Sequence, residues 1–113
     1  MSDCLFCKIV AGSIPSTKVY EDETVYAFRD INPQAPVHIL LVPKAHIASS
    51  YEVTSQNCQV VGHIFEVISQ LAEHEGLHNG YRVVTNCGAD GCQSVHHLHF
   101  HVLGGRQMAG EMA

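Results

Sequence analysis

The sequence predicts a single α+β domain, in which one short and one long helix pack on a mostly antiparallel sheet of five strands. A chain of 113 residues, 46% of them hydrophobic, suits one domain with its own core, and no linker or repeat divides residues 1–113. Apolar residues recur at helical spacing in one long segment, and the other apolar segments are short runs between turn residues.

The first helix is expected within residues 2–15. Ser2 or Asp3 is positioned to cap its N-terminus. Gly12 followed by Pro15 is expected to end it.

The long helix is expected over residues 54–76. Thr54 or Ser55 is the expected N-cap, and Gly76 is the expected C-cap. Its apolar stripe, which faces the core, consists of Val61, Ile64, Phe65, Ile68, Leu71 and Ala72.

The remaining apolar segments are expected to be strands. Residues 17–30 contain a polar turn at 21–23, which predicts two strands. The next segment holds two prolines and is therefore a loop rather than the centre of a sheet. This loop covers residues 31–36, a glycine-rich turn covers 87–93, and the other strands are expected at 37–43, 80–86 and 97–105.

The charge balance argues against nucleic acid as a partner. Six cations against eleven acidic groups give a net charge of −5, and the cations are spread along the chain. Apolar runs stay well short of the length that spans a membrane, and the N-terminus has neither the basic region nor the apolar core of a signal peptide. We therefore expect a cytoplasmic protein that binds no membrane.

Histidines and cysteines are the residues most suggestive of chemistry. The chain has nine histidines and five cysteines, and an odd number of cysteines argues against a disulfide scaffold. On a strand, His97, His99 and His101 would share one face, while His96 would point away from them. Three histidines at two-residue spacing are explained better by a zinc site on this face, or by nucleophilic catalysis by the middle imidazole, than by a purely structural role.

The segment 97–103, HLHFHVL, resembles the signature of the histidine triad superfamily. The surrounding stretches 91–108 and 28–47 are similar to the Hint-type branch, the purine nucleoside phosphoramidases, and the similarity runs from Phe6 to Met108. The resemblance implies a HIT-like fold whose sheets join edge to edge in a homodimer. It also implies an AMP- or GMP-type nucleotide as substrate or product.

The resemblance assigns the chemistry to residues of the last strand. His99 would attack the α-phosphate and form a nucleotidyl-histidine that water hydrolyses. His101 would bind phosphoryl oxygens or assist proton transfer, Ser94 would help to protonate the leaving amine, and His97 completes the triad. Cys92 stands where many relatives have glycine.

The resemblance also implies a set of nucleotide-binding residues. Their roles are ribose binding by Asp30, phosphate contacts from Asn86, Gln93, Ser94 and Val95, an apolar slot for the base formed by Phe6, Ile9, Phe28 and Ile31, and support of the triad by His38.

Cys4 and Cys7 form a C-x₂-C pair, a spacing at which two thiolates chelate one ion. A redox role needs a βαβ context that this sequence lacks. Some bacterial members of the family bind a structural zinc with such a pair and two histidines, which points here to His46 and His97. The alternative is two unmetallated thiols.

The leading function is hydrolysis of purine nucleoside phosphoramidates or adenylated amines. Three alternatives remain open from the sequence: cleavage of dinucleoside polyphosphates, non-catalytic nucleotide binding, and a zinc hydrolase that uses the triad itself as ligands.

Overall fold

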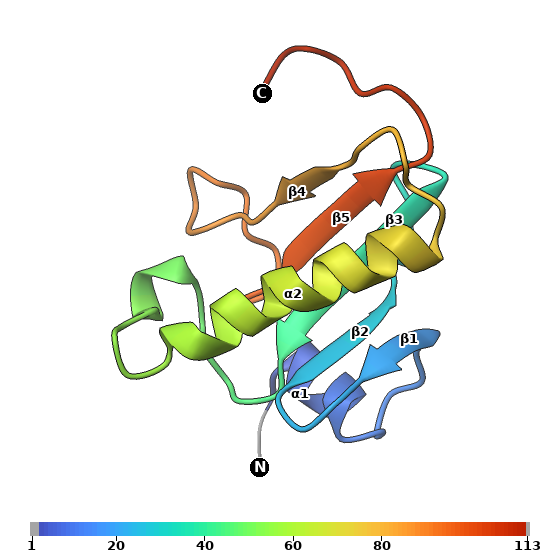
Figure 1. Cartoon of the computed structure of the whole chain (residues 1–113). Helices are drawn as coiled ribbons and strands as arrows, with labels where there is room; N and C mark the ends of the chain where they lie inside the picture. Colours follow the sequence, from blue (N-terminus) through green and yellow to red (C-terminus); the bar gives the residue numbers. More distant parts are fainter. Residues whose placement is uncertain (1–2, 113) are drawn as a thin grey trace.

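The computed structural model, which describes residues 3–112, shows a five-stranded antiparallel sheet with two α-helices (Figure 1). The strands follow the order β1-β2-β3-β5-β4 across the sheet. In chain order the elements are α1 (Leu5–Val10), β1 (Lys18–Glu21), β2 (Val25–Arg29), β3 (Val37–Pro43), the 3-10 helix η1 (Ser50–Glu52), α2 (Cys58–His74), β4 (Arg82–Val84) and β5 (Phe100–Gly104). The predicted α+β class and strand number are confirmed.

The two helices cover opposite faces of the sheet, as Figure 1 shows. Alternation along β3 divides its side chains: Ile39 and Leu41 pack with α2, while Leu40 and Val42 pack with α1. The α2 face holds the larger core, and the smaller core beneath α1 contains Phe6 of that helix. The candidate histidines His97 and His99 lie on this face, against Phe6 of α1.

The N-terminal cap of α1 is Cys4, not Asp3 as predicted. The Cys4 Sγ accepts a hydrogen bond from the main-chain N–H of Cys7 at 3.4 Å. The other predicted cap, Ser2, lies outside the described residues. The turn of the C-x₂-C pair therefore also begins the helix.

The long helix begins later than predicted, at Cys58 with Asn57 as its N-cap. The carbonyl of Thr54 accepts the N–H of Cys58, and the Asn57 side chain accepts the N–H of Thr54, so these residues form a separate turn before the helix. Neither Thr54 nor Ser55 therefore caps it.

At the other end of α2, the C-cap is Glu75 and Gly76 follows it with φ +74°. The N–H of Leu77 donates to Ala72 O and that of Gly76 to Glu73 O, the pattern of a Schellman motif. Within the described residues, neither helix has the length and hydropathy that would let it cross a membrane.

Candidate active site and metal centre

The histidine segment enters β5 later than the sequence predicts. β5 begins at Phe100, so His97 and His99 precede it, whereas a strand was expected over 97–105. The ladder with β3 stops because Pro43 has no main-chain N–H, and its carbonyl accepts the Nε2–H of His97 at 2.8 Å. Strand β4 is likewise shorter than the predicted 80–86.

The alternation of faces nevertheless continues through this segment. Its apolar members, Leu98, Phe100 and Val102, lie in the core beneath α2. The ring of His99 packs edge-on against Phe6 of α1, with centroids 5.0 Å apart, and against His101, with centroids 5.1 Å apart. His96 is exposed.

A main-chain carbonyl fixes the protonation of His99. Its Nδ1 lies 2.7 Å from His97 O, which can only accept, so Nδ1 carries the proton and Nε2 keeps its lone pair. Burial lowers the pKa of His99, although the hydrogen bond to His97 O and the charge of Asp30 oppose this shift. The ring is therefore neutral near pH 7 and has the free nitrogen that a nucleophile needs.

A second chain of hydrogen bonds fixes His101. The N–H of Gln34 donates to His38 Nδ1 at 3.0 Å, so the proton of His38 is on Nε2, 2.9 Å from His101 Nδ1. His101 therefore accepts at Nδ1 and presents Nε2–H as a donor. Burial, together with the neighbouring His99 and His38, lowers the pKa of His101 to about 4, so this donor is a neutral imidazole.

Asp30 closes the same network from the end of β2. Its Oδ2 lies 3.4 Å from His38 Nε2, and its Oδ1 accepts the N–H of Asn32 at 2.8 Å. Among the residues expected around a base, Phe6, Ile9 and Phe28 form one buried cluster. Ile31 is 99% exposed on the loop after β2 and does not join this cluster.

The expected phosphate-side residues lie in the loop before β5. The Gln93 side chain is held by the protein itself: Oε1 accepts the N–H of Gly88, and Nε2 donates to Ala48 O and Val95 O. Ser94 is exposed, and Val95 packs on the α1-side core. Asn86 is half-buried just after β4.

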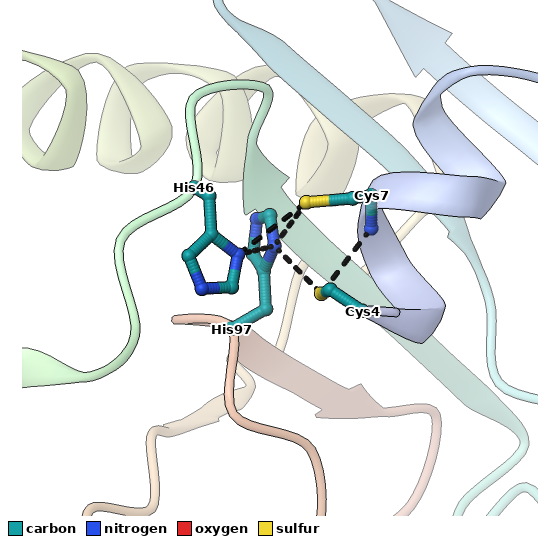
Figure 2. Close-up of side chains that lie close together, drawn as sticks. All are labelled: Cys4, Cys7, His46 and His97. Atoms are coloured by element: carbon teal, nitrogen blue, oxygen red, sulfur yellow. Dashed lines mark hydrogen bonds between the residues drawn. The ribbon is translucent and has the colours of Figure 1, made fainter. Parts of the chain in front are cut away.

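The four predicted metal ligands converge at the start of α1, as Figure 2 shows. His97 Nδ1 lies 3.3 Å from Cys4 Sγ, 3.5 Å from Cys7 Sγ and 3.2 Å from His46 Nδ1, and Cys7 Sγ lies 3.3 Å from His46 Nδ1. Tetrahedral zinc, with bonds of about 2.3 Å to sulfur and about 2.0–2.1 Å to nitrogen, separates its donors by about 3.3–3.8 Å. The donor set fits such an ion.

His97 has the tautomer that a ligand requires. Because its Nε2–H is donated to Pro43 O, its Nδ1 lone pair points at the thiols. Burial lowers the pKa of His97, which favours the neutral, metal-binding form. His97 therefore faces the cysteines, whereas His99 packs between Phe6 of α1 and His101.

Sequence reasoning missed the main-chain groups that orient these rings. Pro43 O, His97 O and the N–H of Gln34 set three tautomers, and Thr85 Oγ1 donates to His99 O at 2.7 Å. The only signal available was the loop prolines around Gln34, which indicate a rigid turn but not its hydrogen bonds.

Comparison with known proteins agrees with this geometry. The HIT domain family matches residues 11–108. The chain is 51% identical over 109 residues to the 14 kDa zinc-binding protein of Zea mays, covering 95% of this chain and 85% of the relative. It is 46% identical over 109 residues to adenylylsulfatase HINT1 of Arabidopsis thaliana, covering 95% and 74%.

Solved structures resemble this chain in both sequence and fold. A histidine triad protein from Clostridium difficile is 49% identical with a TM-score of 0.95, covering 98% of this chain and 97% of that one. A HIT family hydrolase from Clostridium thermocellum is 46% identical with a TM-score of 0.96, covering 100% and 99%. The sequence match and the fold agree, and the chain belongs to the histidine triad (HIT) family.

Proposed function

We propose that this protein is a nucleotide hydrolase that cleaves purine nucleoside phosphoramidates or adenylated amines and releases an AMP-type nucleotide. The observation that carries the proposal is the fixed tautomer of His99, which leaves Nε2 unprotonated on a neutral, buried ring. His101, beside it, accepts a hydrogen bond at Nδ1 and therefore carries its proton on Nε2, where it acts as a donor. A nucleophile and a donor side by side suit attack on phosphorus.

In the first step, His99 Nε2 forms a bond to the α-phosphorus and the bond from phosphorus to the amine nitrogen breaks. The leaving amine takes up a proton from the Ser94 hydroxyl, and His101 keeps its Nε2–H. In the second step, water attacks the phosphorus, the bond to Nε2 breaks, and a proton of the water returns to the Ser94 oxygen, which restores both Ser94 and His99. The His101 donor stabilises the phosphoryl oxygens in both steps.

The nucleotide would lie on the α1 face. Asp30 keeps lone pairs available for the vicinal ribose hydroxyls beside the bonds it already accepts. The base would contact the apolar surface that Phe6, Ile9, Phe28 and the exposed Ile31 provide. Phosphate contacts come from the loop of Gln93, Ser94 and Val95, and from Asn86.

The direct test is His99→Ala, with turnover of adenosine 5′-phosphoramidate as the measurement. We expect turnover to fall at least about 10³-fold while AMP still binds, because the nucleophile is lost. His96→Ala is the matched control, since His96 is exposed beside the site, and should retain wild-type turnover. Normal turnover of His99→Ala would disprove the covalent mechanism.

The name of the Arabidopsis relative supplies a second candidate substrate, adenylyl sulfate. Sulfate would leave in place of the amine and needs no proton. Ser94→Ala should therefore slow the phosphoramidate reaction but not the adenylyl sulfate reaction. Equal slowing of both would remove Ser94 from its role at the leaving group.

We also propose that Cys4, Cys7, His46 and His97 bind one structural zinc ion. The donor distances and the tautomer of His97 support this. Four protein ligands leave no open position for a water, so the ion would stabilise the fold rather than activate a nucleophile.

Metal analysis tests this second proposal. The gently purified protein should contain one zinc per chain, and Cys7→Ala should lose the metal and unfold at a lower temperature. Cys58→Ala, which changes an exposed thiol on α2, should keep both the zinc and the wild-type unfolding temperature. Well under one zinc per chain in the wild type would contradict the site. Chelator inhibition of a protein that stays folded, reversed by zinc, would instead favour a zinc hydrolase.

A further inference from the structure

The glycine-rich turn before the histidine segment, residues 87–92, has a cysteine at each end that the proposed reaction does not use. Its sequence is CGADGC. Cys87 is half-buried and Cys92 is exposed, and the structure shows no disulfide at either residue. Two thiols at the ends of one short turn form a candidate redox pair.

The turn is closed by its own main chain. The N–H of Cys92 donates to Ala89 O at 3.1 Å, and the N–H of Gln93 donates to Gly88 O at 3.0 Å. Cys92 has φ +58°, and it is the only non-glycine residue with a positive φ in the part of the chain that the structure describes. This left-handed conformation normally favours glycine, so the thiol is held at a strained position.

The closed turn brings its two ends together. A Cβ added to Gly91 would lie only 2.6 Å from Cys87 O and 2.8 Å from Cys87 N, so the main chains of residues 87 and 91 are in contact. The Cα of Cys92 is one residue further, at about 3.8 Å from that of Gly91. A disulfide joins Cα atoms about 4.4–6.8 Å apart, a span that two residues at the ends of this short closed turn can meet.

The surroundings of Cys87 favour its thiolate. Hydrogen bonds from the hydroxyls of Ser50 and Ser49, and from the main-chain N–H groups of Tyr51 and Ser50, lower the pKa of the Cys87 thiol. A thiolate is the form that attacks an oxidant. The two cysteines thus differ: Cys87 is activated, and Cys92, at the other end of the same turn, is exposed.

We propose that Cys87 and Cys92 form a dithiol that a hydroperoxide oxidises to an intramolecular disulfide. The Cys87 sulfur attacks the peroxide, the O–O bond breaks, and water or an alcohol leaves after protonation, which produces a sulfenic acid. The Cys92 sulfur then attacks the Cys87 sulfur, the S–O bond breaks, and water leaves with the Cys92 proton. The two thiols lose two electrons in total, and the hydroperoxide gains them.

Peptide mapping of the full-length protein tests this directly. Trypsin cleaves after Arg82 and Arg106, so one peptide, 83–106, contains both cysteines of the turn. After treatment with hydrogen peroxide, this peptide should lose the mass of two hydrogen atoms and regain it on reduction with dithiothreitol. The exposed Cys58 lies in the separate peptide 45–82 and should remain reduced over the same period.

Two variants separate the roles of the cysteines. Cys92→Gly, which suits the positive φ, should leave Cys87 as a sulfenic acid that dimedone traps. Cys87→Ser should prevent oxidation of the turn. The proposal is overturned if peptide 83–106 keeps both thiols, if Cys58 reacts as fast, if Cys87 of the wild type stops at an acid without a disulfide, or if only covalent dimers form.

Discussion

At the scale of single residues, main-chain groups decide which nitrogen of each active-site ring carries a proton. A carbonyl holds the Nδ1–H of His99, and the N–H of Gln34 acts through His38 on His101. The side chains supply the reactivity, but their tautomers depend on atoms that every residue has. A substitution that removes one of these main-chain N–H groups should therefore change the chemistry.

Gln34→Pro makes this change, because it removes the N–H that donates to His38. We expect the tautomer preference of His38 and His101 to weaken and turnover to fall about fivefold, the equivalent of about 1 kcal/mol for one hydrogen bond. Nitrogen-15 NMR of the imidazoles would show the tautomers. Gln34→Ala, which retains the N–H, is the control, and equal behaviour of the two variants would contradict the relay.

The residue types of the site were predictable from the sequence, and their hydrogen-bonding states were not. The alternation of histidines and apolar residues places His97, His99 and His101 on one face. The partners that fix their protons, such as Pro43 O, are main-chain atoms brought close by folding, and no side-chain pattern marks them.

At the scale of elements, α2 has one glycine in its interior and another directly after its C-cap, and the two differ in conformation. Gly62 lies in the helix interior, with open space where a Cβ would be, whereas Gly76 has φ +74° at the C-terminal Schellman motif. Gly62→Ala should raise the free energy of unfolding by about 0.5–1 kcal/mol. Gly76→Ala should lower it by about 1–2 kcal/mol. Urea unfolding measures both, and effects of the same sign would contradict this reading.

A carboxylate–histidine cluster ties α2 to the turn between β1 and β2. His63 Nε2 lies 2.6 Å from Asp22 Oδ2, and its Nδ1 lies 2.9 Å from Glu66 Oε1. Hydrogen bonds to Glu66 and then Asp22 raise the pKa of His63 above its usual value. The contribution to stability is therefore complete below the unfolded pKa of about 6.5, and it is lost as pH rises through the higher folded pKa.

The stability difference between the wild type and His63→Gln should consequently be larger at about pH 6 than at about pH 8.5. Urea unfolding at several pH values gives this difference directly, and pH effects common to both proteins cancel. A difference that stays constant over this range would mean that His63 does not change its charge there.

The helix boundaries show where sequence patterns reach their limit. The apolar stripe located α2 and Gly76 located its end, but the predicted start was several residues early. Thr54 resembles an N-cap in type, yet it uses its hydrogen bonds in a turn with Asn57. Any of several polar residues can cap a helix, and packing decides among them.

At the scale of the whole molecule, we propose that the chain forms a homodimer through the free edge of β4. This strand is at the end of the sheet, and Tyr81, directly before it, and Phe65 of α2 are large apolar side chains that remain 42% and 48% exposed. An open edge and exposed aromatic rings are features that pairing with a second copy would cover.

Light scattering should therefore give twice the mass of the chain, and Tyr81→Lys combined with Phe65→Lys should give the monomer mass. A charge at the opposite edge, Thr17→Lys beside β1, should leave the dimer intact. A monomeric wild type would exclude this assembly.

The convergence of Cys4 and His97 has a consequence for the order in which the molecule becomes active. These residues are 93 positions apart, so the site closes a loop that includes almost the entire chain. Closing so long a loop costs more entropy than forming any local contact, and this contact is expected to form late in folding. Phe6, on the same turn of α1 as Cys4 and Cys7, packs against the ring of His99. The surroundings of His99 are therefore also expected to form late in folding. A newly synthesised chain would then have no reactive imidazole in its final setting until its first and last elements have met.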